Sequence, residues 1–78
     1  MSNIERNSTL KSILIEYAKS GERLRFYGHG MMILAEGTID FVGDGVVGIK
    51  HQNKEKADEF VLIECLSKVQ VLGEYGHY

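Results

Sequence analysis

The spacing of the apolar residues changes at Gly21, and this change most constrains how the chain can fold. Before Gly21, residues 8–20 carry one apolar stripe at helical spacing, formed by Leu10, Ile13, Leu14, Tyr17 and Ala18. Asn7 or Ser8 is suited to cap the start of this helix, and Gly21 to cap its end. After Gly21 the apolar residues alternate with polar ones, which is typical of short strands. The sequence therefore predicts one N-terminal helix followed by β-structure.

Five short strands are expected after the helix. Glycine-rich or polar segments separate them, and we place the strands at residues 23–27, 31–42, 46–50, 60–63 and 68–72. Residues 43–45 (Gly-Asp-Gly) predict a tight hairpin with positive φ angles, and residues 51–58 form a polar loop. Five bent antiparallel strands in so few residues favour a small closed barrel.

The longest expected strand, 31–42, contains a glycine that predicts a bend. Alternation places Ile33, Ala35, Gly37, Ile39 and Phe41 on one face of this strand. Because glycine has no side chain, Gly37 permits a sharp bend or a close backbone approach at that point. Met31 and Met32 begin the same strand and are expected in the core or in an interface.

The chain is long enough for one domain, at residues 1–72, with the barrel at about 22–72. Residues 73–78 are expected to form a flexible tail. A chain of 78 residues with one cysteine has a small core and no disulfide to support it. The segment 60–63 is apolar at every position, which is typical of a strand covered on both faces. We therefore expect a homo-oligomer, with an interface formed by Phe60, Val61, Leu62, Ile63, Val69 and Val71.

Charge and composition narrow the classes of function. The formal net charge of −2 and the pI near 5.9 argue against a protein that coats nucleic acid by bulk charge. The unpaired Cys65 suits a reducing compartment and is expected to be buried. No apolar run is long enough for a membrane span, and no signal-peptide pattern is present. We expect a cytoplasmic protein that does not enter membranes.

Two segments resemble the motifs of the Sm-like superfamily, which includes the LSm proteins and bacterial Hfq. Residues 36–47 (EGTIDFVGDGVV) resemble the first Sm motif, in which a glycine within a strand precedes an Asp-containing turn. Residues 61–71 (VLIECLSKVQV) resemble the second motif. The resemblance extends over about residues 8–72, and the chain is identified as a divergent member of bacterial or phage type. It implies an Sm-like (or SH3-like) barrel that assembles into a ring of about five to seven identical subunits.

The resemblance also implies single-stranded RNA at two loops, near Asp44 and Gly45 and at residues 63–66. The chain departs from the family pattern at both loops. Gly45 occupies the position of the base-stacking residue, and Ile63-Glu64 replaces the basic pair. We therefore expect RNA contacts on other cationic positions, at Lys50, His51, Lys54 and Arg25.

The remaining motifs and residues of the sequence indicate no cofactor, metal site or catalytic activity. Residues 43–48 match G-x-G-x-x-G, but a strand rather than a helix is expected to follow them, so we expect no cofactor. The three histidines are far apart in sequence, and we expect neither a metal site nor an enzyme. Two alternatives to an RNA-binding ring stay open. One is a ring-forming structural or protein-interaction module without an RNA pocket, and the other is an SH3-like barrel of another superfamily.

Overall fold

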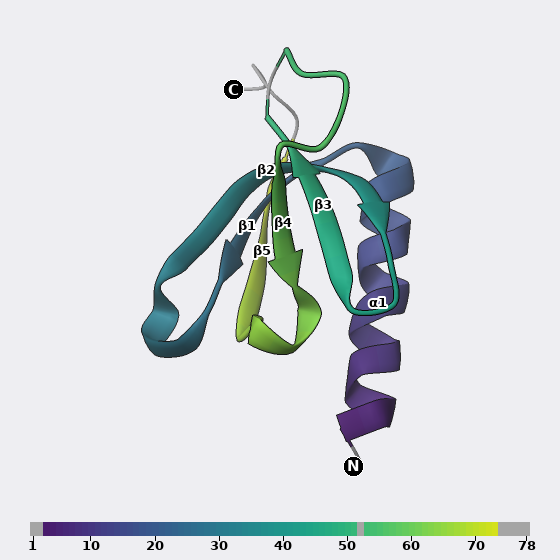
Figure 1. The fold of residues 1–78 in the computed structure, drawn as a ribbon, viewed down its shortest axis with the longest axis vertical. Helices are drawn as coiled ribbons and strands as arrows, with labels where there is room; N and C mark the ends of the chain where they lie inside the picture. Colours follow the sequence, from purple (N-terminus) through teal and green to yellow (C-terminus); the bar gives the residue numbers. More distant parts are fainter. Residues whose placement is uncertain (1–2, 52, 74–78) are drawn as a thin grey trace.

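A helix and five antiparallel strands make up the fold (Figure 1). The computed structural model describes residues 3–51 and 53–73. The elements are α1 (Asn3–Ser20), β1 (Arg23–Tyr27), β2 (Ile33–Val42), β3 (Val46–Lys50), β4 (Glu59–Leu62) and β5 (Lys68–Gly73). Two short 3-10 helices, η1 (His29–Met31) and η2 (Ile63–Cys65), connect β1 to β2 and β4 to β5. The predicted class, a mainly β chain with one N-terminal helix and five antiparallel strands, is confirmed.

The strands form one bent sheet in the order β4-β3-β2-β1-β5, so β4 and β5 are its edges. The sheet is not closed, and the barrel expected from the sequence is therefore corrected to an open sheet. Bending takes place along β2, because Ile33–Gly37 of this strand pair with β1 and Thr38–Val42 pair with β3. A Cβ atom at Gly37 would lie 2.5 Å from the Lys50 carbonyl oxygen, which confirms the close backbone approach predicted there.

Helix α1 is longer than expected, since its backbone is helical from Asn3. The caps predicted at Asn7 or Ser8 are therefore wrong. No glycine or proline occurs in residues 3–7 to stop the helix from extending. The helix ends as predicted, with Gly21 at φ +72° and its N–H donating to the Tyr17 carbonyl at 3.1 Å.

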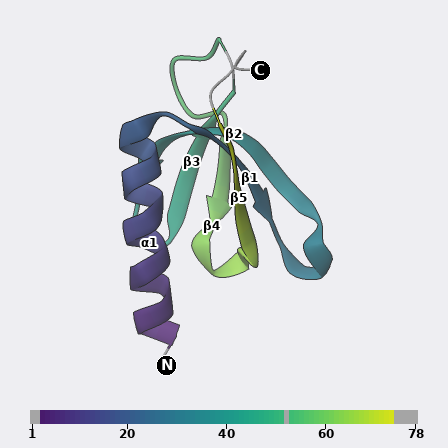
Figure 2. The ribbon, with the colours of Figure 1, turned by 180° about the vertical axis from the view of Figure 1, so that it is seen from behind.

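One hydrophobic core lies between α1 and the concave side of the sheet. Figure 2 shows α1 alongside the sheet from behind. Leu14 of α1 is fully buried there, and the helix packs against β2 and η2. The core consists of Leu14, Leu24, Phe26, Ala35, Ile39, Val47, Ile49, Val61 and Ile63. Ile13, predicted on the same apolar stripe, is instead 47% exposed.

Two bulges in β2 change which side chains share a face, so the face predicted for this strand is partly wrong. The pairing register shifts between Ile39 and Phe41, and a second shift lies where Tyr27 of β1 pairs with Ile33. Each bulge inverts the alternation, so the strand residue beyond it points to the other side of the sheet. Ile33 and Phe41 are consequently exposed, whereas Ala35 and Ile39 share the buried face.

The remaining boundaries differ from the prediction by a few residues. Met31 belongs to η1 with φ +62°, and Met32 follows it, so both are exposed outside the strand expected at 31–42. The hairpin at residues 43–45 is confirmed by the Gly43 N–H donating to the Val46 carbonyl. The positive φ angles predicted for this turn are wrong, because neither of its glycines adopts one. Gly73 ends β5, and residues 74–78 of the expected tail lie outside the described part of the chain.

Candidate functional site

The structure separates the candidate RNA-binding residues into three places. Asp44 and Gly45 lie in the β2–β3 hairpin at one end of the sheet, close to η2. Lys50, His51 and Lys54 lie at the opposite end, where β3 leads into the loop 51–58 (Figure 1). Arg25 lies midway along β1 on the outer side of the sheet, away from the core residues Leu24 and Phe26.

The β2–β3 hairpin and η2 are neighbours, as the family resemblance implies for its two RNA-binding loops. The Ile63 N–H donates a hydrogen bond to the Gly45 carbonyl at 2.9 Å. Asp44 is ion-paired with Lys11 of α1, with Lys11 Nζ 2.9 Å from Asp44 Oδ1. The hydrogen bond and the charge of Lys11 lower the pKa of the Asp44 carboxyl. Asp44 therefore carries a negative charge on a turn that would have to approach phosphate.

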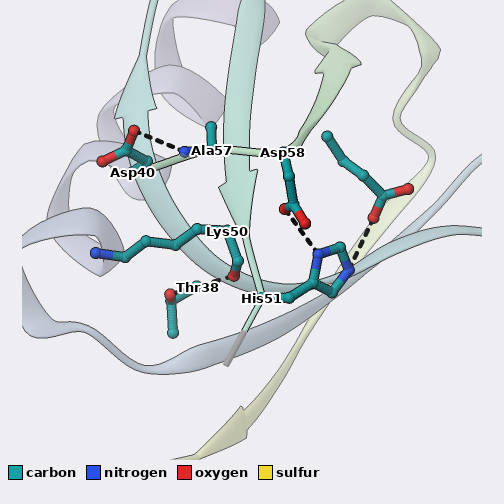
Figure 3. Close-up of polar contacts among 7 residues, drawn as sticks. Thr38, Asp40, Lys50, His51, Ala57 and Asp58 are labelled. Atoms are coloured by element: carbon teal, nitrogen blue, oxygen red, sulfur yellow. Dashed lines mark hydrogen bonds and ion pairs between the residues drawn. The ribbon is translucent and has the colours of Figure 1, made fainter. Parts of the chain in front are cut away.

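His51 lies between two carboxylates at the other end of the sheet. Its Nδ1 is 2.7 Å from Asp58 Oδ1, and its Nε2 is 3.0 Å from Glu59 Oε1 (Figure 3). The hydrogen bond with Asp58 raises the pKa of His51 and lowers the pKa of Asp58. A positive charge on His51 would therefore already be paired within the subunit.

The loop 51–58 is fixed to the sheet by backbone hydrogen bonds. The Asp58 N–H donates to the Ile49 carbonyl at 3.0 Å, and the Lys54 N–H donates to the His51 carbonyl at 3.1 Å. Asp40 of β2 accepts a hydrogen bond from the Ala57 N–H at 3.1 Å (Figure 3). Lys54 is exposed and Lys50 is half-buried, and neither forms an ion pair with any residue in the ranges 3–51 and 53–73.

Arg25 belongs to a polar network on the outer side of β1, β2 and β5. Its Nε donates to Glu36 Oε1 at 2.7 Å, and its guanidinium also reaches the Tyr27 hydroxyl at 3.5 Å. The Tyr27 hydroxyl donates to Gln70 Oε1 at 2.7 Å, and the Lys68 ammonium lies 4.8 Å from the centre of the Tyr27 ring. The hydrogen bonds to Tyr27 and Glu36 raise the pKa of Arg25. The guanidinium of Arg25 is therefore charged, but it is already paired with Glu36 and in contact with Tyr27.

The residues expected at an oligomer interface are divided between the core and the surface. Val61 and Ile63 face the core, and Val69 is half-buried at the open edge. Phe60 is 63% exposed, Leu62 is 52% exposed and Val71 is 43% exposed. The segment 60–63, apolar at every position, therefore alternates between a buried and an exposed side. Its exposed side chains lie on β4, which has no partner strand on its outer edge.

A second apolar feature was missed by the sequence reasoning. Phe41 and Phe60 lie on the outer side of the sheet with ring centroids 6.2 Å apart, and both pair in register with Gly48 of β3. A Cβ atom at Gly48 would overlap the Phe41 ring, so this glycine makes room for the ring to lie across β3. The signal available in the sequence was a glycine inside the strand 46–50, a position usually taken by a larger residue. We call Phe41, Phe60 and Leu62 the outer apolar patch.

Cys65 is exposed, which corrects the expectation of a buried residue. It belongs to η2, whose short turn directs only Ile63 into the core. With His29 and Met32 it borders a hollow of about 450 Å³ between η2 and the β1–β2 connection. Among the residues that the structure describes, no group of three or more His, Cys, Asp or Glu side chains is placed to hold a metal ion.

None of the helices in the ranges 3–51 and 53–73 combines the length and the apolar character needed to cross a membrane. Comparison with known protein families, with curated proteins and with solved structures finds no match to the chain.

Proposed function

We propose that the chain is a homo-oligomeric Sm-like protein whose subunits join through β4 and β5 and whose ring binds single-stranded RNA. The observation that carries this proposal is the pair of unlike open edges at the two ends of the sheet. Within the part of the chain that the structure describes, neither edge has a partner strand on its outer side, and each displays exposed apolar side chains: Phe60 and Leu62 on β4, and Val71 on β5. β4 of one copy and β5 of the next can continue the sheet across an interface.

The exposed apolar side chains supply a driving force for this pairing. Complete burial of a Leu, Val or Phe side chain contributes about 1.5–3 kcal/mol. Phe60, Leu62 and Val71 together therefore favour association by several kcal/mol per interface, before the entropy cost of association is subtracted. Natural edge strands usually carry charges, prolines or bulges that prevent pairing. On β4 such protection is limited to Glu59 at its first position, and its carboxylate is engaged by His51.

Two features support RNA as the ligand of the assembly. The hairpin and η2, which the resemblance implies as RNA-binding loops, are joined by the Ile63–Gly45 hydrogen bond. Lys50 and Lys54 are cations without an ion-pair partner in the described ranges, and a ring would repeat them in every subunit. We propose a binding role rather than catalysis, about five to seven subunits per ring, and a cytoplasmic location.

A ring-forming structural or protein-interaction module is the second candidate, and the ion pairs favour it. Arg25 is paired with Glu36, and His51 with Asp58 and Glu59, so two of the four proposed cationic contacts are already engaged by carboxylates within the subunit. The net charge of −2 acts in the same direction. Such a module would keep the edge pairing and bind no RNA.

Light scattering combined with size-exclusion chromatography tests the assembly. We expect the parent chain to have the mass of a closed oligomer at micromolar concentration. Leu62→Lys should yield a monomer, because a charge at this edge would be buried without a partner in the interface. Ile13→Lys adds the same charge at an exposed position of α1 and should leave the oligomer intact. A folded monomer of the parent chain would contradict the proposal.

Fluorescence anisotropy with labelled oligo-U, oligo-A and mixed-sequence RNA, at two salt concentrations, separates the two candidates. Binding that weakens with salt supports the RNA-binding ring. An oligomer that binds none of these RNAs at low salt supports the structural module instead.

A further inference from the structure

His51 joins the end of β3 to the start of the edge strand β4 through both nitrogens of its ring. Nδ1 lies 2.7 Å from Asp58 Oδ1, and Nε2 lies 3.0 Å from Glu59 Oε1 (Figure 3). A neutral imidazole has one N–H and can donate to only one of these carboxylates. The imidazolium donates to both. The geometry therefore fits the protonated ring, and loss of the proton would leave a ring lone pair against a carboxylate oxygen.

Backbone hydrogen bonding places both carboxylates beside the ring. Asp58 is fixed by the hydrogen bond from its N–H to the Ile49 carbonyl, and Glu59 is paired with Ile49 in the sheet. Within the ranges 3–51 and 53–73, no other acidic side chain lies within ion-pairing distance of His51. The other charged residues adjoining His51 in the chain are Lys50, Lys54, Glu55 and Lys56, and Asp40 of β2 contacts the same loop at Ala57. Deprotonation of His51 would thus leave two adjacent carboxylates without their shared cation.

We propose that His51, Asp58 and Glu59 form a pH-sensitive clasp that holds the start of β4 when the imidazole is protonated and releases it when the proton is lost. Glu59 is the first residue of β4, and among the described strands β4 is hydrogen-bonded in the sheet to β3 alone, so repulsion at Glu59 acts on an edge strand. The consequence for assembly rests on the proposed function. Because β4 is the proposed interface strand, its release should weaken the pairing of subunits.

The direction of the pH dependence follows from the pKa shifts of His51 and Asp58. The pKa of His51 is raised above its unfolded value of about 6.5, so its contribution is complete below that pH and is lost as the pH rises through the raised pKa. The pKa of Asp58 is lowered, so its contribution is present above about pH 4 and is lost as the pH falls through the lowered pKa. The clasp should be strongest between about pH 4 and pH 6.5.

Thermal unfolding of the parent and three variants, from pH 5.5 to pH 8.5, tests the clasp itself. We expect the parent to lose about 3–6 °C more in Tm over this range than His51→Gln. His51→Arg keeps the charge without titrating and should also lose less Tm than the parent. His29→Gln, at an exposed position of η1, should behave like the parent. In the parent, NMR titration of the His51 ring protons should give a pKa above 6.5.

Two results would overturn the clasp: a His51→Gln variant with the full pH dependence of the parent, or a His51 ring that titrates at or below about 6.5. Measuring the oligomer mass over the same pH range tests the effect on assembly. An oligomer of the parent that dissociates above neutral pH, while the oligomer of His51→Arg persists, supports that effect. A parent that is monomeric at every pH overturns the proposed function. The Tm and NMR results still decide, independently of assembly, whether the clasp exists.

Discussion

At the scale of single residues, glycines in the sheet differ in what a side chain would meet. A Cβ atom at Gly37 would lie 2.5 Å from the Lys50 carbonyl oxygen, which is backbone and cannot move without displacing β3. A Cβ atom at Gly45 would meet nothing within 4 Å, and the φ angle of Gly45 is not positive. The first glycine is required by the close approach of two strands, whereas the second only occupies a turn.

Gly37→Ala should therefore lower the free energy of unfolding by about 2–3 kcal/mol, because the two strands must move apart. Gly45→Ala should change it by less than about 0.5 kcal/mol. Urea unfolding followed by circular dichroism measures both values at fixed protein concentration. Equal stability of the two variants would contradict the close approach of β2 and β3 at Gly37.

At the scale of elements, β2 shows how far the sequence could predict the fold. Alternation correctly placed Ala35 and Ile39 on one face, which is the buried one, because they lie in the regularly paired middle of the strand. It failed at Ile33 and Phe41, where a bulge inverts the alternation. A bulge depends on the register with a neighbouring strand, and one sequence contains no direct signal for that register.

The candidate site was predictable to a similar extent. The sequence identified the cations Arg25 and His51, because their residue types and the polar loop are visible in it. The sequence did not show which carboxylate pairs with which cation, since Glu36 reaches Arg25 from a neighbouring strand and Glu59 reaches His51 from across a loop. Pairing in space decides whether a cation is available to a ligand, and spacing in the sequence does not reveal it.

The loop 51–58 gives a prediction at this scale. Asp40→Ala removes the acceptor of the Ala57 N–H and should increase hydrogen exchange of the backbone amides of residues 53–58. Its cost in unfolding free energy should be about 0.5–1.5 kcal/mol. Asp40→Asn keeps an acceptor oxygen and should retain most of the protection. Unchanged exchange in Asp40→Ala would show that this hydrogen bond does not hold the loop.

At the scale of the whole molecule, the two lysines proposed to contact RNA and the acidic turn at Asp44 lie at opposite ends of the sheet. Lys50 and Lys54 lie at the end of the loop 51–58, and Asp44 lies at the opposite end (Figure 1). An RNA strand bound by phosphate contacts should therefore prefer the lysine end. Bound there, it would meet several copies of Lys50 and Lys54 at once.

Lys50→Glu combined with Lys54→Glu should weaken RNA binding by more than about tenfold and should flatten its dependence on salt, because fewer counterions are released. Fluorescence anisotropy at two salt concentrations measures both effects. Lys19→Glu, on α1, changes an exposed lysine that is already near Glu16 and should have little effect. Parent-like binding by the double variant would show that RNA contacts a different surface.

The unlike edges of the sheet have a consequence for mixtures of variants. If β4 of one copy pairs only with β5 of the next, every subunit is a link with two different ends. A Leu62→Lys chain has a blocked β4 but an intact β5, so it can still attach to a parent subunit and then offers no further attachment point. Such a chain acts as a terminator of growth. A minor fraction of this variant should therefore reduce the yield of closed particles by more than its own share of the mixture. The remaining subunits would form open fragments where the parent alone forms closed particles.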